Sequence, residues 1–279
     1  MIREAFFETF GLLKTLPLLW LGGLIIAAIS AGDILVGGMA SATMGGIQIL
    51  SFLLFPFIIA GSYGIIREKK GDLATFIRYA TGYYFRVLLP LILIVFAAIV
   101  TIFLLLIPMA IMGGDLNPDM IFFIAMGVTI PFMLFTFFYD CFAVFKDEKI
   151  FDSIRSSITI VLYQAWKVLL FIVVNIVVLG TLLFGLAFVW MGLLWEKMSG
   201  IAAMDPEVIS AMSSEEVMSL LGPDALFATA VIIFIWALIA TPFTIAFKGA
   251  FFQQLGEMPV IEQQPQVGVY DEKGRWYKY

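Results

Sequence analysis

The sequence predicts an all-α polytopic membrane protein with about six transmembrane helices, and three observations lead to this fold class. Hydrophobic residues make up 62% of the 279 residues and charged residues only 13%, whereas a soluble domain is about half apolar and a quarter charged. Several apolar runs reach the roughly 20 residues that a helix needs to cross the hydrocarbon layer. Basic residues are also sorted to one side of these runs, as in a chain with a fixed orientation in a bilayer.

The six predicted spans are the six longest apolar runs. The third to fifth runs exceed the length that a bilayer requires, which predicts helices that tilt or extend beyond the membrane. In chain order the predicted spans are Leu16–Gly32, Ile47–Ile66, Val87–Met112, Met120–Phe145, Val168–Trp195 and Leu226–Phe247.

The positions of lysine and arginine predict the orientation. Of the 16 Lys and Arg residues, only Lys197 falls on the side opposite the others. Because cytoplasmic loops are enriched in these residues, we expect a multi-pass protein of the cell (plasma) membrane with both termini cytoplasmic and loop 196–224 outside. Two segments of that loop, Asp205-Pro206-Glu207 and Ser213-Ser-Glu-Glu216, carry signals for the start of a helix.

An amphipathic segment precedes each odd-numbered span. Apolar residues recur every three or four positions within 2–13, 73–84 and 150–165, which is the pattern of a helix with one apolar face. Helices of this kind lie in the membrane interface, with the apolar face among the acyl chains. We therefore expect three interfacial helices, each followed by a basic residue at the mouth of a span.

Each even-numbered span contains a Pro-Phe pair, at Pro56, Pro131 and Pro242. The unit of amphipathic helix, span, loop and span with Pro-Phe therefore occurs three times, which predicts an internal repeat. Chance occurrence in a chain with 28 phenylalanines is the alternative. The repeats of the single transmembrane domain, 1–252, would be 1–70, 71–149 and 150–252.

The remaining segment, 253–279, is polar and is expected as a cytoplasmic tail. Its aromatic arms, Val267–Tyr270 and Arg275–Tyr279, flank the turn-like sequence Asp-Glu-Lys-Gly. This pattern is typical of a small hairpin; a frayed terminus whose aromatic side chains touch the headgroups is the alternative.

The composition also limits the chemistry. The chain has no histidine and only one cysteine, Cys141, which excludes histidine acid–base catalysis, an internal disulfide and a CxxC site. No strongly basic stretch suggests nucleic acid. We therefore predict no catalytic residues, no cofactor, no metal site and a protein that is not an enzyme.

Three intramembrane polar residues are the candidate site residues, because ionisable groups within spans are rare and mark functional positions. Asp140 lies late in the fourth span and requires a partner, water or a proton. Lys248 lies late in the sixth span and can either extend to the headgroups or pair with Asp140. Asn175 lies within the fifth span, where an interhelical hydrogen bond is favoured over a role in transport.

The segment that follows the fourth span resembles known proteins. It reads Phe142-Ala-Val-Phe-Lys-Asp-Glu-Lys149, continues Ile150-Phe-Asp-Ser-Ile-Arg-Ser-Ser157, and enters the next span at Trp166-Lys167. It resembles poorly characterised prokaryotic six-helix membrane families, including the membrane domain fused to some glycerophosphodiester phosphodiesterases. The resemblance implies a six-helix membrane module without catalytic residues, since the phosphodiesterase domain itself is absent.

Two classes of function are consistent with these features. A non-enzymatic membrane module would bind membrane lipids, or another membrane protein, or a second copy of itself as a homo-oligomer. The alternative is a transporter or channel for a small solute or ion, which the intramembrane polar residues would serve.

Overall fold

A computed structural model describes residues 1–37, 44–111, 117–205, 207, 212, 213, 216, 220–255, 268–270 and 276–278. It confirms the predicted fold class, because six of its helices are long and apolar enough to cross a membrane. The spans are α2 (Leu19–Gly37), α3 (Met44–Glu68), α4 (Leu73–Ile111), α5 (Pro118–Phe135) with α6 (Tyr139–Phe145), α8 (Ala165–Leu193) and α12 (Pro223–Gln254).

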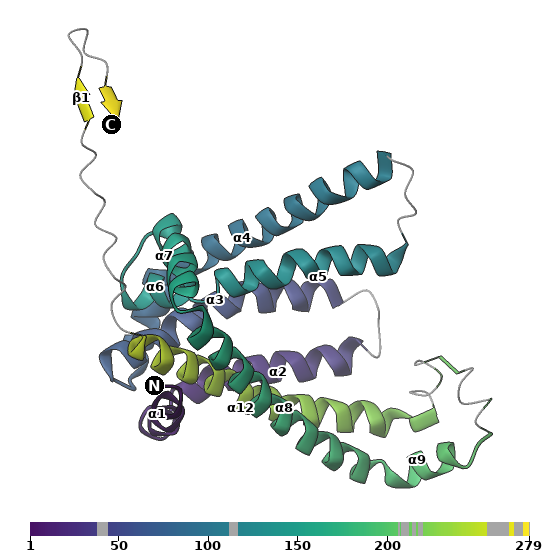
Figure 1. Cartoon of the computed structure of the whole chain (residues 1–279). Coiled ribbons are helices and arrows are strands. Elements are labelled where there is room, and N and C mark those ends of the chain that lie inside the picture. The colour runs from purple at the N-terminus through teal and green to yellow at the C-terminus, as the bar shows by residue number, and fades with distance from the viewer. Residues whose placement is uncertain are drawn as a thin grey trace.

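The packed core lies at one end of the bundle. We call this end the basic end, because Arg67, Arg86 and Lys149 lie there. The helices converge at the basic end, and α4 and α5 spread apart toward the opposite end (Figure 1). At that opposite end α8 and α12 stay in contact, because Trp190 donates a hydrogen bond to Thr229 and a small hydrophobic cluster surrounds Leu194 and Ala225. Among the largest fully buried side chains are Tyr63 and four phenylalanines, which belong to one hydrophobic cluster: Phe138, Phe171, Phe247 and Phe251.

Two of the three predicted amphipathic helices are separate helices. The first, α1 (Ile2–Thr15), ends just before Pro17, because a residue that precedes proline is disfavoured in helical conformation. The third, α7 (Ile150–Tyr163), is separated from α8 by Gln164. The second prediction was wrong, since segment 73–84 forms the first turns of the continuous helix α4.

Each amphipathic segment packs on the even-numbered span of the unit before it. The start of α4 packs on α3, where Gly61 faces the ring of Phe76. Helix α7 packs on α6, and α1 closes the cycle on α12 through a contact between Phe6 and Phe247. Three repeats around a common axis would produce this cyclic order, while the repeat boundaries themselves stay a prediction.

The fourth span is interrupted, whereas the sequence predicted a single helix. Helix α5 ends at Phe135 and α6 begins at Tyr139. The hydroxyl of Ser157, on α7, accepts a hydrogen bond from the Phe138 N–H and donates one to the Phe135 carbonyl, both at 2.9 Å. The side chain from α7 therefore satisfies backbone groups that the interruption leaves free.

Two predicted details outside the spans are confirmed. The Ser213 hydroxyl and the Glu216 carboxylate exchange hydrogen bonds with each other's backbone N–H groups, which is a capping box. In the tail, β1 (Gly268–Tyr270) pairs with β2 (Trp276–Lys278) in an antiparallel hairpin. Its predicted turn, 271–274, lies outside the described residues.

Candidate functional site

The candidate site begins with an ion pair between two of the three predicted residues. The Lys248 Nζ atom lies 2.7 Å from the Asp140 Oδ2 atom. The two side chains are 12% and 4% exposed, so Lys248 pairs with Asp140 and does not extend to the membrane surface. The Lys248 ammonium also lies 4.5 Å from the centre of the Phe137 ring, within the range of a cation–π interaction.

A third buried group, which the sequence did not single out, completes the site. The Tyr63 hydroxyl donates a hydrogen bond of 3.5 Å to Asp140 Oδ2. Tyr63 lies on α3, Asp140 on α6 and Lys248 on α12, so each of the three Pro-Phe spans contributes one side chain. We call these three residues the central cluster.

The surroundings of the central cluster are close-packed. Cys141, next to Asp140, is fully buried. The ring of Tyr63 contacts Phe145 at 5.2 Å between centroids, and Phe138 contacts Phe251 at 6.1 Å. Either charge alone would be unfavourable in such an apolar environment. The ion pair between Lys248 and Asp140 therefore joins their two spans.

The third predicted residue, Asn175, is not part of this cluster. Its side chain on α8 is buried, and its Oδ1 atom has no hydrogen-bond partner among the described residues. The predicted interhelical hydrogen bond is therefore not made by this oxygen and stays a prediction for the side chain. Among the described residues, α8 and α12 are instead joined by a hydrogen bond of 2.9 Å that Trp190 Nε1 donates to the Thr229 hydroxyl.

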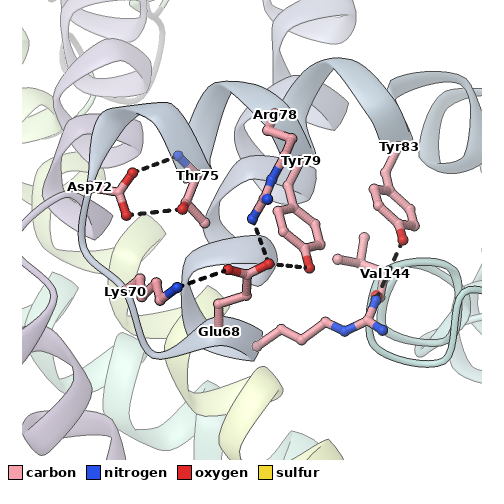
Figure 2. Close-up of polar contacts among 9 residues, drawn as sticks. Glu68, Lys70, Asp72, Thr75, Arg78, Tyr79, Tyr83 and Val144 are labelled. Carbon is pink, nitrogen blue, oxygen red and sulfur yellow. Dashed lines mark hydrogen bonds and ion pairs between the residues drawn. The ribbon is translucent and has the colours of Figure 1, made fainter.

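A second polar group, at the basic end, joins the end of α3 to the start of α4. Figure 2 shows the Glu68 carboxylate facing Arg78, Tyr79 and Lys70. The first of these contacts is an ion pair of 2.5 Å. Beside it, the Asp72 carboxylate accepts hydrogen bonds from the N–H and the hydroxyl of Thr75 (Figure 2). These bonds lower the pKa of Asp72 below its usual value, the backbone N–H having the larger effect.

The same polar group extends to the turn between α6 and α7. The Arg67 guanidinium donates to the Val144 carbonyl at 2.6 Å. Asp147 accepts hydrogen bonds from Tyr83 and from Arg86, and these two partners hold the Asp147 pKa below its usual range. The second and fourth spans are thereby joined to the start of α4 by charged groups at the basic end.

Sequence reasoning missed most of this second group. Arg67 contributed to the prediction only as one of the basic residues that indicate the orientation, and no interaction was predicted for Glu68 or Asp147. Glu68 and Arg78 lie ten residues apart across a helix–turn–helix connection, a spacing for which the sequence offers no simple pattern. The signal that was available is the pair of glycines Gly61 and Gly64, which predicts a close approach of two helices.

Comparison with protein families finds one match. The model of a domain of unknown function, DUF7847, matches residues 1–255, which include all six spans and the central cluster. No curated protein and no solved structure matches the chain.

Proposed function

The chain belongs to the DUF7847 family of domains of unknown function, and we propose that it is a non-enzymatic membrane module that binds lipid or a membrane partner. In a cell membrane, the basic end would lie on the cytoplasmic side together with both termini, as the distribution of Lys and Arg favours. We favour lipid as the ligand because of the apolar surfaces that the bundle leaves exposed.

One observation supports lipid binding most strongly, namely the exposure of the third, fourth and fifth spans. About half of the positions in the second and sixth spans are buried, but few in the third, fourth and fifth. Large apolar side chains on these spans are exposed, for example Phe103, Phe122 and Phe184. Such a surface fits acyl chains or the helices of a partner.

Co-purification tests this function. The protein is purified in a mild detergent, and bound molecules are counted by native mass spectrometry and identified by lipid extraction. We expect phospholipid in whole-number stoichiometry, or a stable partner protein, after prolonged washing. A lipid-free, partner-free chain that catalyses solute flux in proteoliposomes would contradict the proposal.

A transporter for a small solute or ion is the second candidate, and the central cluster is the observation that favours it. Buried ionisable groups within spans often belong to ion or proton pathways. Flux across a panel of solutes and ions in proteoliposomes tests this candidate. Flux that is lost in Asp140→Asn would support it, and no flux with any of the solutes would eliminate it.

A further inference from the structure

Two surface pockets at the basic end each include part of a connection that follows a Pro-Phe span. The first, of about 420 Å³, is lined by residues of α1 and by Lys69 and Gly71. The second, of about 450 Å³, is lined by Arg86, Lys149, Ile150, Phe151 and Asp152. We call them the α1 pocket and the α7 pocket.

Both pockets include residues of the connection after a Pro-Phe span, Lys69 and Gly71 in one and Lys149 in the other. The α1 pocket is completed by the amphipathic helix before its connection, whereas the α7 pocket is completed by Arg86 and by the start of the amphipathic helix after its connection. Each of these two connections contains one non-glycine residue with positive φ, Lys69 at 54° and Asp147 at 57°. The two connections therefore share a backbone feature, although different helices complete the two pockets.

The α7 pocket differs from the α1 pocket in its charge. Two cations, Arg86 and Lys149, and one carboxylate, Asp152, line the α7 pocket. Arg86 is already paired with Asp147 through one of its nitrogens, but a guanidinium has five N–H donors. Lys149 has no ion pair within 4 Å among the described residues. The lining of the α1 pocket, by contrast, contains one cation, Lys69, and one carboxylate, Glu8, so its formal charges sum to zero.

An exposed aromatic side chain lines the α7 pocket, and another precedes Arg86 in the sequence. Phe151, in its lining, is 74% exposed, and Phe85, next to Arg86 on α4, is 64% exposed. Cationic groups beside exposed aromatic rings at the mouth of a span match the two parts of a phospholipid, a charged headgroup and its acyl chains.

We propose that the α7 pocket binds the headgroup of an anionic phospholipid. Arg86 and Lys149 contact the phosphodiester, Asp152 accepts hydrogen bonds from headgroup hydroxyls, and the acyl chains follow Phe85 and Phe151. This assignment rests on the proposed function as a lipid-binding module, and adds a site and a lipid class to it. The α1 pocket, whose charges balance, has no preference for an anion.

The test compares binding of phosphatidylglycerol and phosphatidylcholine to the detergent-purified full chain by native mass spectrometry. We expect the wild type to prefer phosphatidylglycerol, and Lys149→Ala to weaken that binding about fivefold, since one interfacial basic residue contributes about 1 kcal/mol. Lys149→Arg should retain the binding. Lys69→Ala, in the α1 pocket, and Lys146→Ala, an exposed lysine nearby, should leave it unchanged.

The possible failures are distinguishable. Equal binding of both lipids, or no effect of Lys149→Ala, overturns the site while leaving a lipid-binding module intact. Displacement of phosphatidylglycerol by an equal concentration of inorganic phosphate overturns the assignment to lipid, because the pocket would then bind free phosphate. A wild type that retains no lipid overturns both this site and the proposed function. Unchanged melting temperatures verify that the exposed variants are folded.

Discussion

At the scale of single residues, the central cluster shows how three spans are held together. The Asp140 carboxylate accepts hydrogen bonds from the Lys248 ammonium and the Tyr63 hydroxyl, which belong to two other spans. A buried pair of this kind adds little net stability compared with apolar residues, but the loss of one partner leaves an uncompensated charge. We therefore expect the cluster to contribute more to the specificity of the arrangement than to its free energy.

A double-mutant comparison tests the pair. Lys248→Met should destabilise the protein by about 3 kcal/mol, because it leaves the Asp140 carboxylate buried without its cation. The double variant Asp140→Asn/Lys248→Met should recover most of that loss. Melting temperatures in detergent provide the comparison, and single effects that simply add would show that the two residues do not interact.

The sequence predicted part of the cluster and could not predict the rest. Asp140 and Lys248 were found because charges within apolar runs are conspicuous, and their pairing was one of the two alternatives for Lys248. Tyr63 was missed because a tyrosine in an apolar run is ordinary, and its role depends on how α3 is rotated about its axis. The surroundings of Asn175 could not be predicted for the same reason, and its oxygen has no hydrogen-bond partner among the described residues.

At the scale of elements, glycines determine how closely α3 and α4 approach. A Cβ atom added at Gly64 would lie 2.2 Å from the Cγ atom of Tyr79, a distance that requires the helices to move apart. Gly61 is similarly close to Phe76. The interruption between α5 and α6 is another feature of this scale that the sequence did not predict, because it depends on Ser157 from a different helix.

Alanine at Gly64 should therefore destabilise the protein, by about 1–3 kcal/mol for an overpacked contact. Gly82 supplies a matched control, since it lies exposed on α4 and an added Cβ would meet no atom within 4 Å. Gly82→Ala should be neutral or stabilising by up to about 1 kcal/mol, because glycine disfavours helix interiors. Equal effects of the two substitutions on the melting temperature would contradict the close approach.

The Asp72 carboxylate should make the start of α4 sensitive to pH. Its pKa is lowered in the folded chain by the hydrogen bonds from Thr75, so its stabilising contribution is complete above the ordinary aspartate pKa of about 3.9. That contribution is lost as the pH falls through the lowered pKa. Asp72→Asn retains a capping side chain without the titration.

We therefore expect the melting temperature of the wild type to fall more steeply than that of Asp72→Asn when the pH is lowered from neutral into this range. At neutral pH the two proteins should differ by only a few degrees. Parallel curves for the two proteins would show that Asp72 does not stabilise the helix through its charge.

At the scale of the whole molecule, the fold class and the six spans were predictable because they depend on composition and on the length of apolar runs. The spreading of α4 from α5 was not, since it depends on which faces of the spans pack. Among the described residues, the larger hydrophobic cluster lies at the basic end and includes residues of α1 and α7, and a smaller cluster joins the end of α8 to the start of α12. Amphipathic helices thus close the bundle where the spans converge.

Cysteine labelling in intact cells tests the predicted orientation. In a Cys141→Ala background, Lys146→Cys and Ser199→Cys each place one exposed thiol at opposite ends of the bundle. An impermeant thiol reagent should label Ser199→Cys only, because the basic end is expected to be cytoplasmic. Labelling of Lys146→Cys alone would invert the orientation.

The close packing around the central cluster is the feature on which a binding module and a transporter differ most. Cys141, fully buried beside Asp140, is a natural probe of water access, measured as the rate of its reaction with a small charged thiol reagent in proteoliposomes. We predict that Cys141 stays unmodified while Lys146→Cys, in the Cys141→Ala background, reacts completely, and that Cys141 reacts only after unfolding. Modification of Cys141 in the folded protein at a rate comparable with that control would contradict the module and place Asp140 and Lys248 on an aqueous path.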